Sequence, residues 1–330
     1  MPSPLRIVAI GGGTGLSALL SGLKHFTPEV DITAVVTVTD DGGSSGRLRR
    51  EFDVLPPGDI RNCMVALSED EALLSKLFQY RFQNGRGLKG HSFGNLFLTA
   101  LTHITGEFGE AVKQSSKALA IKGRIYPSTG SNVGLQAELL DGSIVCGETR
   151  ISRSRRGIHR IRLTPRRCKP LPETLDAIAE ADLITLGPGS LFTSVIPNLL
   201  VSGVAKAIRK SPAVKAYFVN LMWQPGETID FRASDHVRAI RKHAGAQILD
   251  YAVVNTRTVS PAMRKRYALE NVSPVENDVE MILGMGLEVI PAKLLRKGTK
   301  VRHDPAAAAE VALHLAHKGR LRKLRKGESL

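Results

Sequence analysis

The chain has 330 residues, of which 42% are hydrophobic, and a formal net charge of +15. This length and apolar content are those of a globular protein that buries a sizeable core. No apolar run is long enough to cross a bilayer, and the first residues lack the basic and apolar regions of a signal peptide, so we expect a cytoplasmic protein.

The three cysteines, Cys63, Cys146 and Cys168, are far apart and odd in number. This argues against a disulfide framework, and none of them lies in a cluster with zinc-site spacing. We therefore expect ordinary reduced cysteines.

The positive charge is concentrated in two segments. Residues 150–169 contain nine Lys and Arg and no acid, and residues 318–326 contain six and no acid, which together account for the whole excess. The two basic surfaces are either solvated or in contact with a phosphorylated ligand, an anionic lipid or nucleic acid. Because no aromatic residue interleaves with either segment, specific nucleic-acid binding is not expected.

The first predicted element is a buried parallel strand over residues 7–10, which runs into Gly11-Gly12-Gly13-Thr14-Gly15 and a helix over residues 16–24. Glycines at such a turn let the backbone approach a ligand, and the free N–H groups of the helix start point at an anion. The spacing differs from the usual dinucleotide fingerprint, because Leu16 stands where the third glycine would be. A tight turn without a ligand is the alternative.

The second predicted strand, residues 32–38, ends in a glycine-rich loop with two acids, Asp40 and Asp41. Acids at this edge of a doubly wound sheet can meet a sugar hydroxyl, a base edge or a metal. In the same loop, Gly43, Ser44 and Ser45 offer backbone and hydroxyl donors to a phosphate. The alternative is a flexible loop.

A rigid Pro-Pro-Gly turn comes next, and Asp59 is expected to be the N-cap of a helix over residues 60–68. Arg61 and Asn62 are better placed than Asp59 to face a ligand. An amphipathic helix is predicted over residues 70–82.

Three polar residues, His91, Ser92 and Asn95, mark the start of the following helix and are candidates for ligand contact. No Asp or Ser partner for His91 is visible in the sequence, so a structural role for it has equal weight. A further helix is predicted over residues 107–121.

An antiparallel insertion is predicted near residues 135–165. Asp141-Gly142 is the turn of a hairpin over residues 136–148, and residues 158–163 alternate apolar and basic side chains like a half-exposed strand. The α/β pattern then resumes, with these expected elements: helix 173–181, strand 182–186, helix 191–200, strand 215–220, helix 234–243, strands 248–255 and 288–290, and a terminal helix 306–316 that the second basic segment extends.

Two more polar turns follow strands of this second half, at Gly187-Pro188-Gly189-Ser190 and in the loop from Asn220 to Thr228, which includes Gln224. The pattern predicts an α/β, Rossmann-like, doubly wound and mostly parallel sheet with an antiparallel hairpin insertion. We expect one such domain over residues 1–317 and a basic C-terminal tail over residues 318–330.

Several sequence blocks together resemble the bacterial gluconeogenesis factor family, which is similar to the 2-phospho-L-lactate transferase superfamily. The blocks are GGGTGLSALLSGLK, TDDGGSSGRLRREF, PPGDIRN, HSFGNL, GPGSLFTS and NLMWQPGETIDF, and the match spans about residues 5–316. The resemblance implies a Rossmann-like domain that binds a UDP-sugar such as UDP-N-acetylglucosamine. It implies a regulatory role in gluconeogenic growth, cell-wall precursor supply and cell shape, with no required cofactor, a protein partner of cell-wall synthesis and a homo-oligomer.

The superfamily leaves an enzymatic alternative, which is a magnesium-dependent transfer of a 2-phospho-L-lactate group from a nucleotide-diphosphate-linked donor. Phosphoryl-type transfer needs mainly positioning and a metal, which Asp40 and Asp41 could hold. A third interpretation uses the basic tail as a nucleic-acid or membrane anchor.

The resemblance also assigns ligand contacts near the end of the chain. Tyr267 can stack on a uracil ring, and Arg302 can pair with a diphosphate. The alternatives are a surface helix residue for Tyr267 and an ion pair with Asp304 for Arg302. The complete set of expected ligand residues is Gly11, Gly12, Gly13, Thr14, Gly15, Asp40, Asp41, Gly43, Ser44, Ser45, Asn62, Asn95, Gly187, Gly189, Ser190, Asn220, Gln224, Tyr267 and Arg302.

Overall fold

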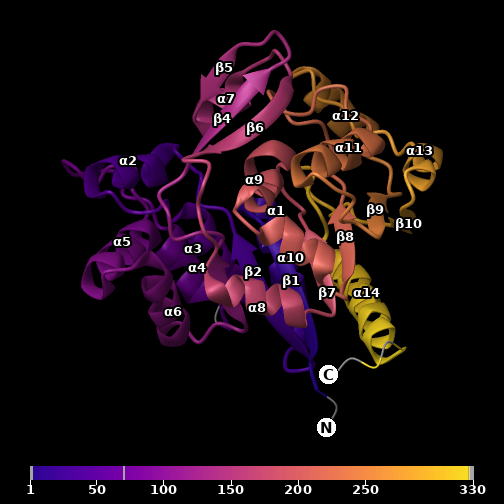
Figure 1. Ribbon diagram of the computed structural model, residues 1–330. Coiled ribbons are helices and arrows are strands. Elements are labelled where there is room, and N and C mark those ends of the chain that lie inside the picture. The colour runs from indigo at the N-terminus through magenta and orange to yellow at the C-terminus, as the bar shows by residue number, and fades with distance from the viewer. Residues whose placement is uncertain (1–2, 70, 326, 328–330) are drawn as a thin grey trace.

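The computed structural model describes residues 3–69, 71–325 and 327. Its centre is a seven-stranded sheet in which every pair of neighbouring strands is parallel (Figure 1). The strand order is β10-β9-β8-β7-β1-β2-β3. The bounds are Leu5–Gly11 for β1, Val30–Val36 for β2, Arg124–Pro127 for β3, Leu183–Leu186 for β7, Val214–Phe218 for β8, Tyr251–Asn255 for β9 and Glu288–Ala292 for β10. The expected doubly wound α/β fold is confirmed.

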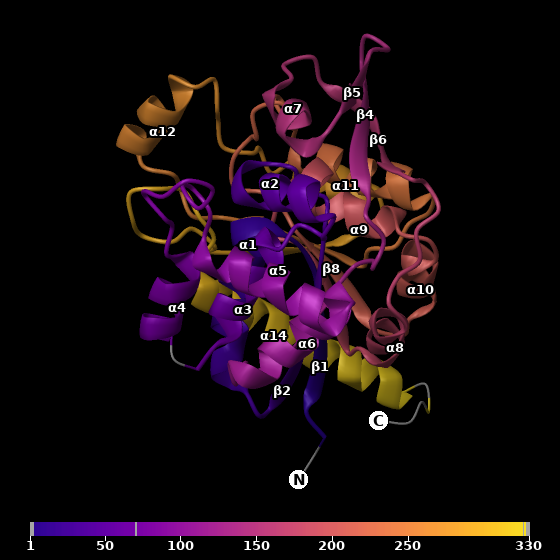
Figure 2. The same cartoon turned by 90° about the vertical axis from the view of Figure 1, so that its left-hand side faces the viewer.

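Helices cover both faces of the sheet (Figures 1 and 2). One face carries α1 (Gly13–Leu23), α3 (Gly58–Leu67) and α14 (Pro305–Arg325). Helices α4 (Glu71–Gln79) and α5 (Phe93–Thr105) pack against α3, and α6 (Phe108–Ala118) packs against α5 and β3. The other face carries α8 (Pro172–Glu180), a π-helical turn η2 (Leu191–Val195) that continues into α9 (Ile196–Leu200), α10 (Val204–Lys210) and α11 (Ala233–Ala244).

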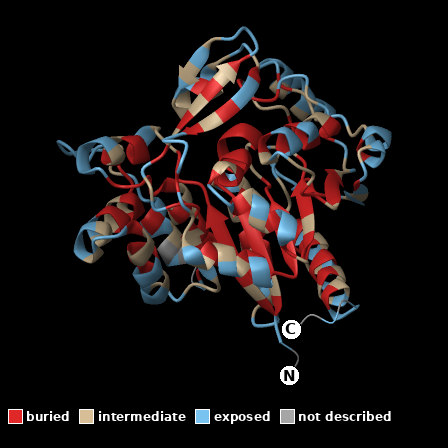
Figure 3. Cartoon of the chain, in the orientation of Figure 1, coloured by how far each residue is buried: buried red, intermediate tan, exposed pale blue. Residues whose placement is uncertain are grey.

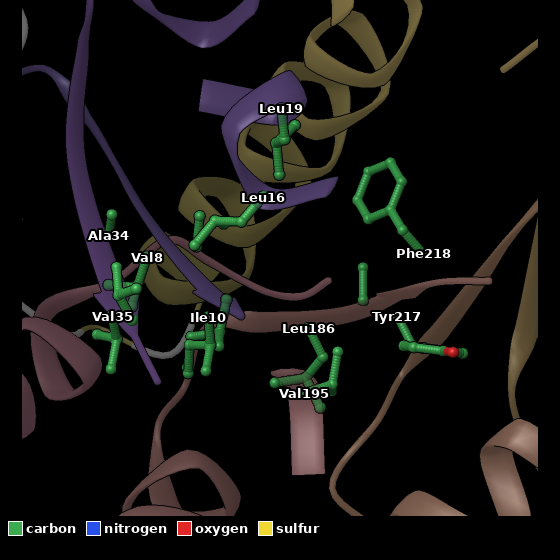
Figure 4. Close-up of a cluster of buried hydrophobic side chains, with 14 of the residues drawn as sticks. Val8, Ile10, Leu16, Leu19, Ala34, Val35, Leu186, Val195, Tyr217 and Phe218 are labelled. Carbon is green, nitrogen blue, oxygen red and sulfur yellow. The ribbon is translucent and has the colours of Figure 1, made fainter. Parts of the chain in front are cut away.

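The sheet is buried from both sides, which explains why its strands are nearly continuous apolar runs (Figure 3). In β1, the residues from Ile7 to Ile10 are at most 2% exposed. Leu16 and Leu19 of α1 pack against this layer from one side and Val195 from the other (Figure 4).

The predicted antiparallel insertion is confirmed. Strands β4 (Gly134–Leu139), β5 (Ile144–Cys146) and β6 (Ile158–Thr164) form a separate sheet of order β5-β4-β6, and a short helix, α7 (Glu148–Arg153), follows β5. This unit stands above the carboxyl ends of the main strands, far from both chain termini (Figure 1).

Several elements differ from the sequence-based expectation. The prediction of a glycine-rich loop after the second strand is wrong beyond Gly42, because a helix, α2 (Gly43–Phe52), begins at the next residue. The helix expected over residues 191–200 starts as the π-helical turn η2. Local sequence patterns did not indicate β3, α7, α10, α12 (Pro261–Ala268) or α13 (Val279–Gly284). All of these elements are short and depend on tertiary packing more than on periodicity.

The second basic segment continues α14 without a break as far as Arg325. Arg320 Nη2 lies 2.7 Å and Lys323 Nζ lies 3.1 Å from the buried carboxylate of Asp182, and Arg322 Nη1 lies 3.0 Å from Asp250. The expected boundary at residue 317 therefore falls inside a helix, and the segment up to residue 325 is packed on the sheet rather than being a free tail. Residues 326 and 328–330 of the expected tail lie outside the described residues.

All three cysteines are free thiols. Within the described part of the chain, no single helix combines the length and the apolar character that a membrane span requires. One pair of helical segments, residues 191–200 and 204–210, meets these two criteria only when the segments are taken together, and the pair is sharply bent at the break between them.

Candidate functional site

The candidate site lies where the strand order reverses, between β1 and β7. From β1 the chain moves outward to β2 and β3, whereas from β7 it moves in the opposite direction to β8, β9 and β10. The loops that leave β1 and β7 therefore diverge and open a crevice at the carboxyl edge of the sheet, which is where ligands bind in doubly wound folds. The first loop is Gly11-Gly12-Gly13 and the second is Gly187-Pro188-Gly189-Ser190.

A cavity of about 500 Å³ occupies this crevice, within the range of small-molecule sites. The start of α1 forms one part of its wall. Gly12 is the N-cap of α1 and provides no side-chain hydrogen bond, so the first N–H groups of the helix are not capped by their own N-cap residue. Such a helix start attracts an anion through its N–H groups and its dipole.

Close packing between the two loops explains their glycines. A Cβ on Gly15 would lie 2.6 Å from the carbonyl oxygen of Pro188, and a Cβ on Gly12 would lie 2.6 Å from Oδ2 of Asp59. Gly13 has a φ of +63°, in the left-handed region that favours glycine. The loops thus interlock through backbone contacts that a side chain would prevent.

The loop after β8 holds the second glycine turn in place. Gln224 Nε2 donates to Ser190 Oγ at 2.6 Å, and its Oε1 accepts from the Leu191 N–H at 3.2 Å. Asn220 Nδ2 donates to the Gly189 carbonyl at 3.1 Å and to Gln224 Oε1 at 2.9 Å. The hydroxyl of the buried Tyr217 donates to Asn220 Oδ1. This network fixes the wall of the cavity before any ligand arrives.

Cationic side chains line the cavity from the loop that precedes α14. They are Arg296 and Arg302. His303, which also lines it, has its pKa lowered to about 4 by burial and is therefore neutral at pH 7. Asp304 does not pair with Arg302 and instead accepts from the Ala307 N–H at the start of α14, at 3.1 Å. The two guanidinium groups are therefore the charged side chains of this wall.

Ten of the expected ligand residues line the cavity, and nine do not. Tyr267 is among the nine, but its hydroxyl accepts a hydrogen bond from the N–H of Val301, which lines the cavity. The ten are Gly12, Gly13, Thr14, Gly15, Asn62, Gly189, Ser190, Asn220, Gln224 and Arg302. The others are Gly11, Asp40, Asp41, Gly43, Ser44, Ser45, Asn95, Gly187 and Tyr267.

The hydroxyl groups that were expected to contact phosphate in the second loop form hydrogen bonds with other side chains of the protein. Ser44 Oγ lies 3.0 Å from His91 Nδ1, which supplies the serine partner that the sequence did not reveal. Ser45 Oγ accepts from Asn95 Nδ2 at 3.4 Å. These side chains lie in the first turn of α2 and at the start of α5, and they join the two helices to each other.

The predicted role of Asp59 as an N-cap is wrong. It is not an N-cap, because Pro57 is the N-cap of α3 and Asp59 lies in the first turn. Its carboxylate instead accepts from the Gly13 N–H of the first glycine loop. Burial and the nearby charge of Asp40 raise the pKa of Asp59 to about 6. No local pattern could reveal this contact, since Gly13 is far away in sequence.

The two acids that follow β2 have different surroundings. Asp40 Oδ1 accepts from the Gly42 N–H at 2.8 Å, whereas Asp41 Oδ1 accepts from the N–H and the hydroxyl of Thr149 at 2.9 and 2.7 Å. Among the described residues, no three His, Cys, Asp or Glu side chains are grouped so that they could hold a metal ion. Magnesium commonly uses only one or two carboxylates together with ligand phosphates, so a site at Asp40 and Asp41 stays a prediction.

The half-buried carboxyl group of Glu148 also lies near these acids, and local sequence patterns did not indicate it. It accepts from Thr39 Oγ1 at 3.3 Å. Burial, and then the charges of Asp40 and Asp59, raise its pKa to about 9. Glu148 begins α7, so this helix joins the insertion to the edge of the sheet where the cavity lies.

The fold and the crevice define a Rossmann-like α/β protein with a cavity at the switch point of its sheet. The family model of the 2-phospho-L-lactate transferase CofD matches residues 7–295. The gluconeogenesis factor of Bacillus subtilis (strain 168) is 49% identical over 311 residues, which cover 94% of this chain and 98% of that protein. The gluconeogenesis factor of Halalkalibacterium halodurans is 48% identical, with 93% and 95% covered.

A solved structure agrees with these relatives. The crystal structure of a Bacillus halodurans protein of the UPF0052 family superposes with a TM-score of 0.91 at 47% identity, covering 94% of this chain and 99% of that chain. The chain belongs to the gluconeogenesis factor family, whose domain is related to CofD, as the sequence blocks indicated.

Proposed function

We propose that this protein binds a UDP-sugar, UDP-N-acetylglucosamine in the first instance, in the cavity between β1 and β7. Its proposed role is that of a regulator linked to gluconeogenic growth, cell-wall precursor supply and cell shape, acting through a protein partner of cell-wall synthesis. The observation that carries the proposal is that Thr14 and Gly15, in the first turn of α1, share the lining of one cavity with the guanidinium groups of Arg296 and Arg302.

A diphosphate suits this combination of groups. Backbone N–H groups at a helix start stabilise negative charge, and an arginine can donate two parallel hydrogen bonds to phosphate oxygens. Around them, Asn62 and Ser17 offer polar contacts for sugar or base edges, and Met222 and Trp223 supply apolar area. A nucleotide sugar has this mixture of anionic, polar and flat apolar parts.

The second candidate is a magnesium-dependent transferase. The match to the CofD family model favours it, as do the half-buried Asp59, which contacts the first glycine loop, and the half-buried Asp40, whose charge raises the pKa of Asp59. A metal would be held by Asp40 or Asp41 together with ligand phosphates, and it would neutralise their charge during transfer. The regulator is the preferred function because the relatives that are 48–49% identical over nearly their whole length are named gluconeogenesis factors.

The test is calorimetric titration of the full chain with UDP-N-acetylglucosamine, with and without magnesium, followed by product analysis of the same mixture. Arg302→Ala removes a charge-assisted contact and is expected to weaken binding about tenfold to a hundredfold. Lys300→Ala is the matched control, because Lys300 is an exposed cation on the same loop and does not line the cavity.

Saturable binding without turnover, weakened by Arg302→Ala and not by Lys300→Ala, supports the regulator. Turnover that is lost in Asp40→Asn or Asp41→Asn supports the transferase and refutes a purely regulatory role. If UDP-N-acetylglucosamine does not bind at all, the proposed ligand is wrong, and GDP-linked compounds are titrated next.

A further inference from the structure

A groove on the outer side of the insertion has no role in the function proposed above. It lies between the β4–β5 hairpin and the segment that runs from α7 to β6, and its volume is about 460 Å³. Strand β5 and helix α7 border it at the top of the molecule, away from the termini (Figure 1). It is lined by Leu139, Ser143, Ile144, Val145, Arg150, Arg153, Ser154 and Arg156.

The rim of this groove is strongly positive. Arg150 and Arg153 are three residues apart in α7 and therefore lie on the same side of the helix. Both are exposed, and among the described residues neither side chain has a hydrogen bond or an ion pair. The nearby acid Asp141 pairs with Arg156 at 3.0 Å, so it does not neutralise the other two.

The hairpin side of the groove is apolar and belongs to an edge strand. Ile144 is 50% exposed, whereas the side chain of its strand neighbour Val145 points to the other face and packs against the core. β5 is at the edge of the sheet β5-β4-β6, so the side of its backbone that faces away from β4 has no partner strand. Edge strands of this kind can pair with an extended peptide, which gains affinity from the main chain and specificity from side-chain pockets.

We propose that this groove is the docking site for an extended acidic segment of a partner protein. Carboxylates of that segment pair with Arg150 and Arg153, and an apolar side chain between them packs on the exposed Ile144. Arginine suits this role because its planar guanidinium binds a carboxylate through two hydrogen bonds.

A peptide fits the groove better than a nucleic acid does. The insertion, residues 134–169, contains no Phe, Tyr or Trp on which a base could stack. The exposed Ile144 that lines the groove offers nothing to a phosphate backbone, whereas an apolar peptide side chain gains from covering it. Charge complementarity with an acidic segment is provided by the two unpaired guanidinium groups.

The groove is connected to the edge of the main sheet by α7. The first residues of this helix, Glu148 and Thr149, contact Thr39 and Asp41 after β2, while Arg150 and Arg153 face the groove. A partner segment would therefore sit on a helix that is anchored beside the cavity. The docking proposal itself does not depend on which ligand the cavity holds.

The experiment measures fluorescence anisotropy of a fluorescein-labelled peptide of five Glu-Val repeats as the full chain is added, at low and at physiological ionic strength. The double variant Arg150→Ser/Arg153→Ser is expected to weaken binding about tenfold or more. Ile144→Ser is expected to weaken it about threefold. The matched control is Arg166→Ser/Arg167→Ser, which removes the same charge from exposed positions of the same basic segment outside the groove.

Three results overturn the proposal. The first is an absence of peptide binding at low ionic strength, with wild-type melting temperatures in all variants. The second is equal weakening by the groove variant and by the control, which would mean attraction to net charge alone. The third is tighter binding of a single-stranded oligonucleotide than of the peptide, lost in Arg150→Ser/Arg153→Ser, which would make the surface a nucleic-acid site.

Discussion

Replacement of Asp182 by asparagine should destabilise the protein strongly, because this carboxylate joins the last helix to the sheet. Asp182 is completely buried and contacts Arg320 and Lys323, whose side chains are only 13% and 6% exposed. It also accepts from the Arg6 N–H at 2.8 Å. Asp182→Asn leaves the two cations without their counter-charge in a site that water hardly reaches.

The magnitude follows from the burial of the pair. Removing one partner of a buried ion pair costs about 3–5 kcal/mol, and we expect the lower end because asparagine still offers an acceptor. The entropy of unfolding is about 2.1 cal/mol/K per residue, or about 0.7 kcal/mol/K for a chain of 330 residues. A loss of about 3 kcal/mol therefore lowers the melting temperature by about 4 °C.

Calorimetric melting of the purified chain measures this shift, with Glu69→Gln as the control. Glu69 pairs with Lys122 at 3.3 Å, but the side chains are 62% and 38% exposed, so its loss should cost less than about 1 kcal/mol. If Asp182→Asn shifts the melting temperature no more than Glu69→Gln does, the reasoning about the buried charge is refuted.

The pH dependence of this effect has a definite sign. Burial alone would raise the pKa of Asp182, but hydrogen bonds from Arg320, the Arg6 N–H and Lys323 hold the pKa below its usual range. A carboxyl group whose pKa is depressed by folding stabilises the folded state above its unfolded pKa, and this stability is lost as the pH falls through the folded value. The difference between the wild type and Asp182→Asn should therefore be full at pH 7 and shrink below about pH 4.

Three further perturbations have clear expected outcomes. Folding raises the pKa of Asp59 to about 6, so the wild type loses stability as the pH rises from about 4 to 7 and Asp59→Asn should gain stability relative to it. If the difference in melting temperature between the two proteins stays constant across this range, the raised pKa of Asp59 is contradicted. Gly15→Ala should lower the melting temperature and abolish nucleotide binding, because its Cβ would meet a rigid backbone carbonyl, whereas Gly130→Ala, in open space, should do neither. Deletion of residues 318–330 should lower the melting temperature at least as much as Asp182→Asn, since it removes both buried cations; an unchanged melting curve would mean that the segment is a free tail after all.

Local sequence patterns were sufficient for the elements whose signals lie within one segment. The strand before Gly11, the turn that follows it and the start of α1 could be predicted because apolar runs, glycines and helix starts are short-range features. The hairpin around Asp141-Gly142 was predictable for the same reason. The order of these elements was enough to indicate the doubly wound fold and the glycine loops at its crevice.

Tertiary structure alone decided which polar residues meet. Asp59 of α3 reaches Gly13, and Thr149 of α7 reaches Asp41, because the tertiary fold brings these helices to the loops that follow β1 and β2. Such pairings leave no trace in a single sequence. The second basic segment is a further example. Its charge suggests a solvated tail, but in the tertiary structure Arg320 and Lys323 form ion pairs with the buried Asp182. Propensity and spacing act over a few residues, whereas burial and charge pairing depend on the packing of elements that lie far apart in the chain.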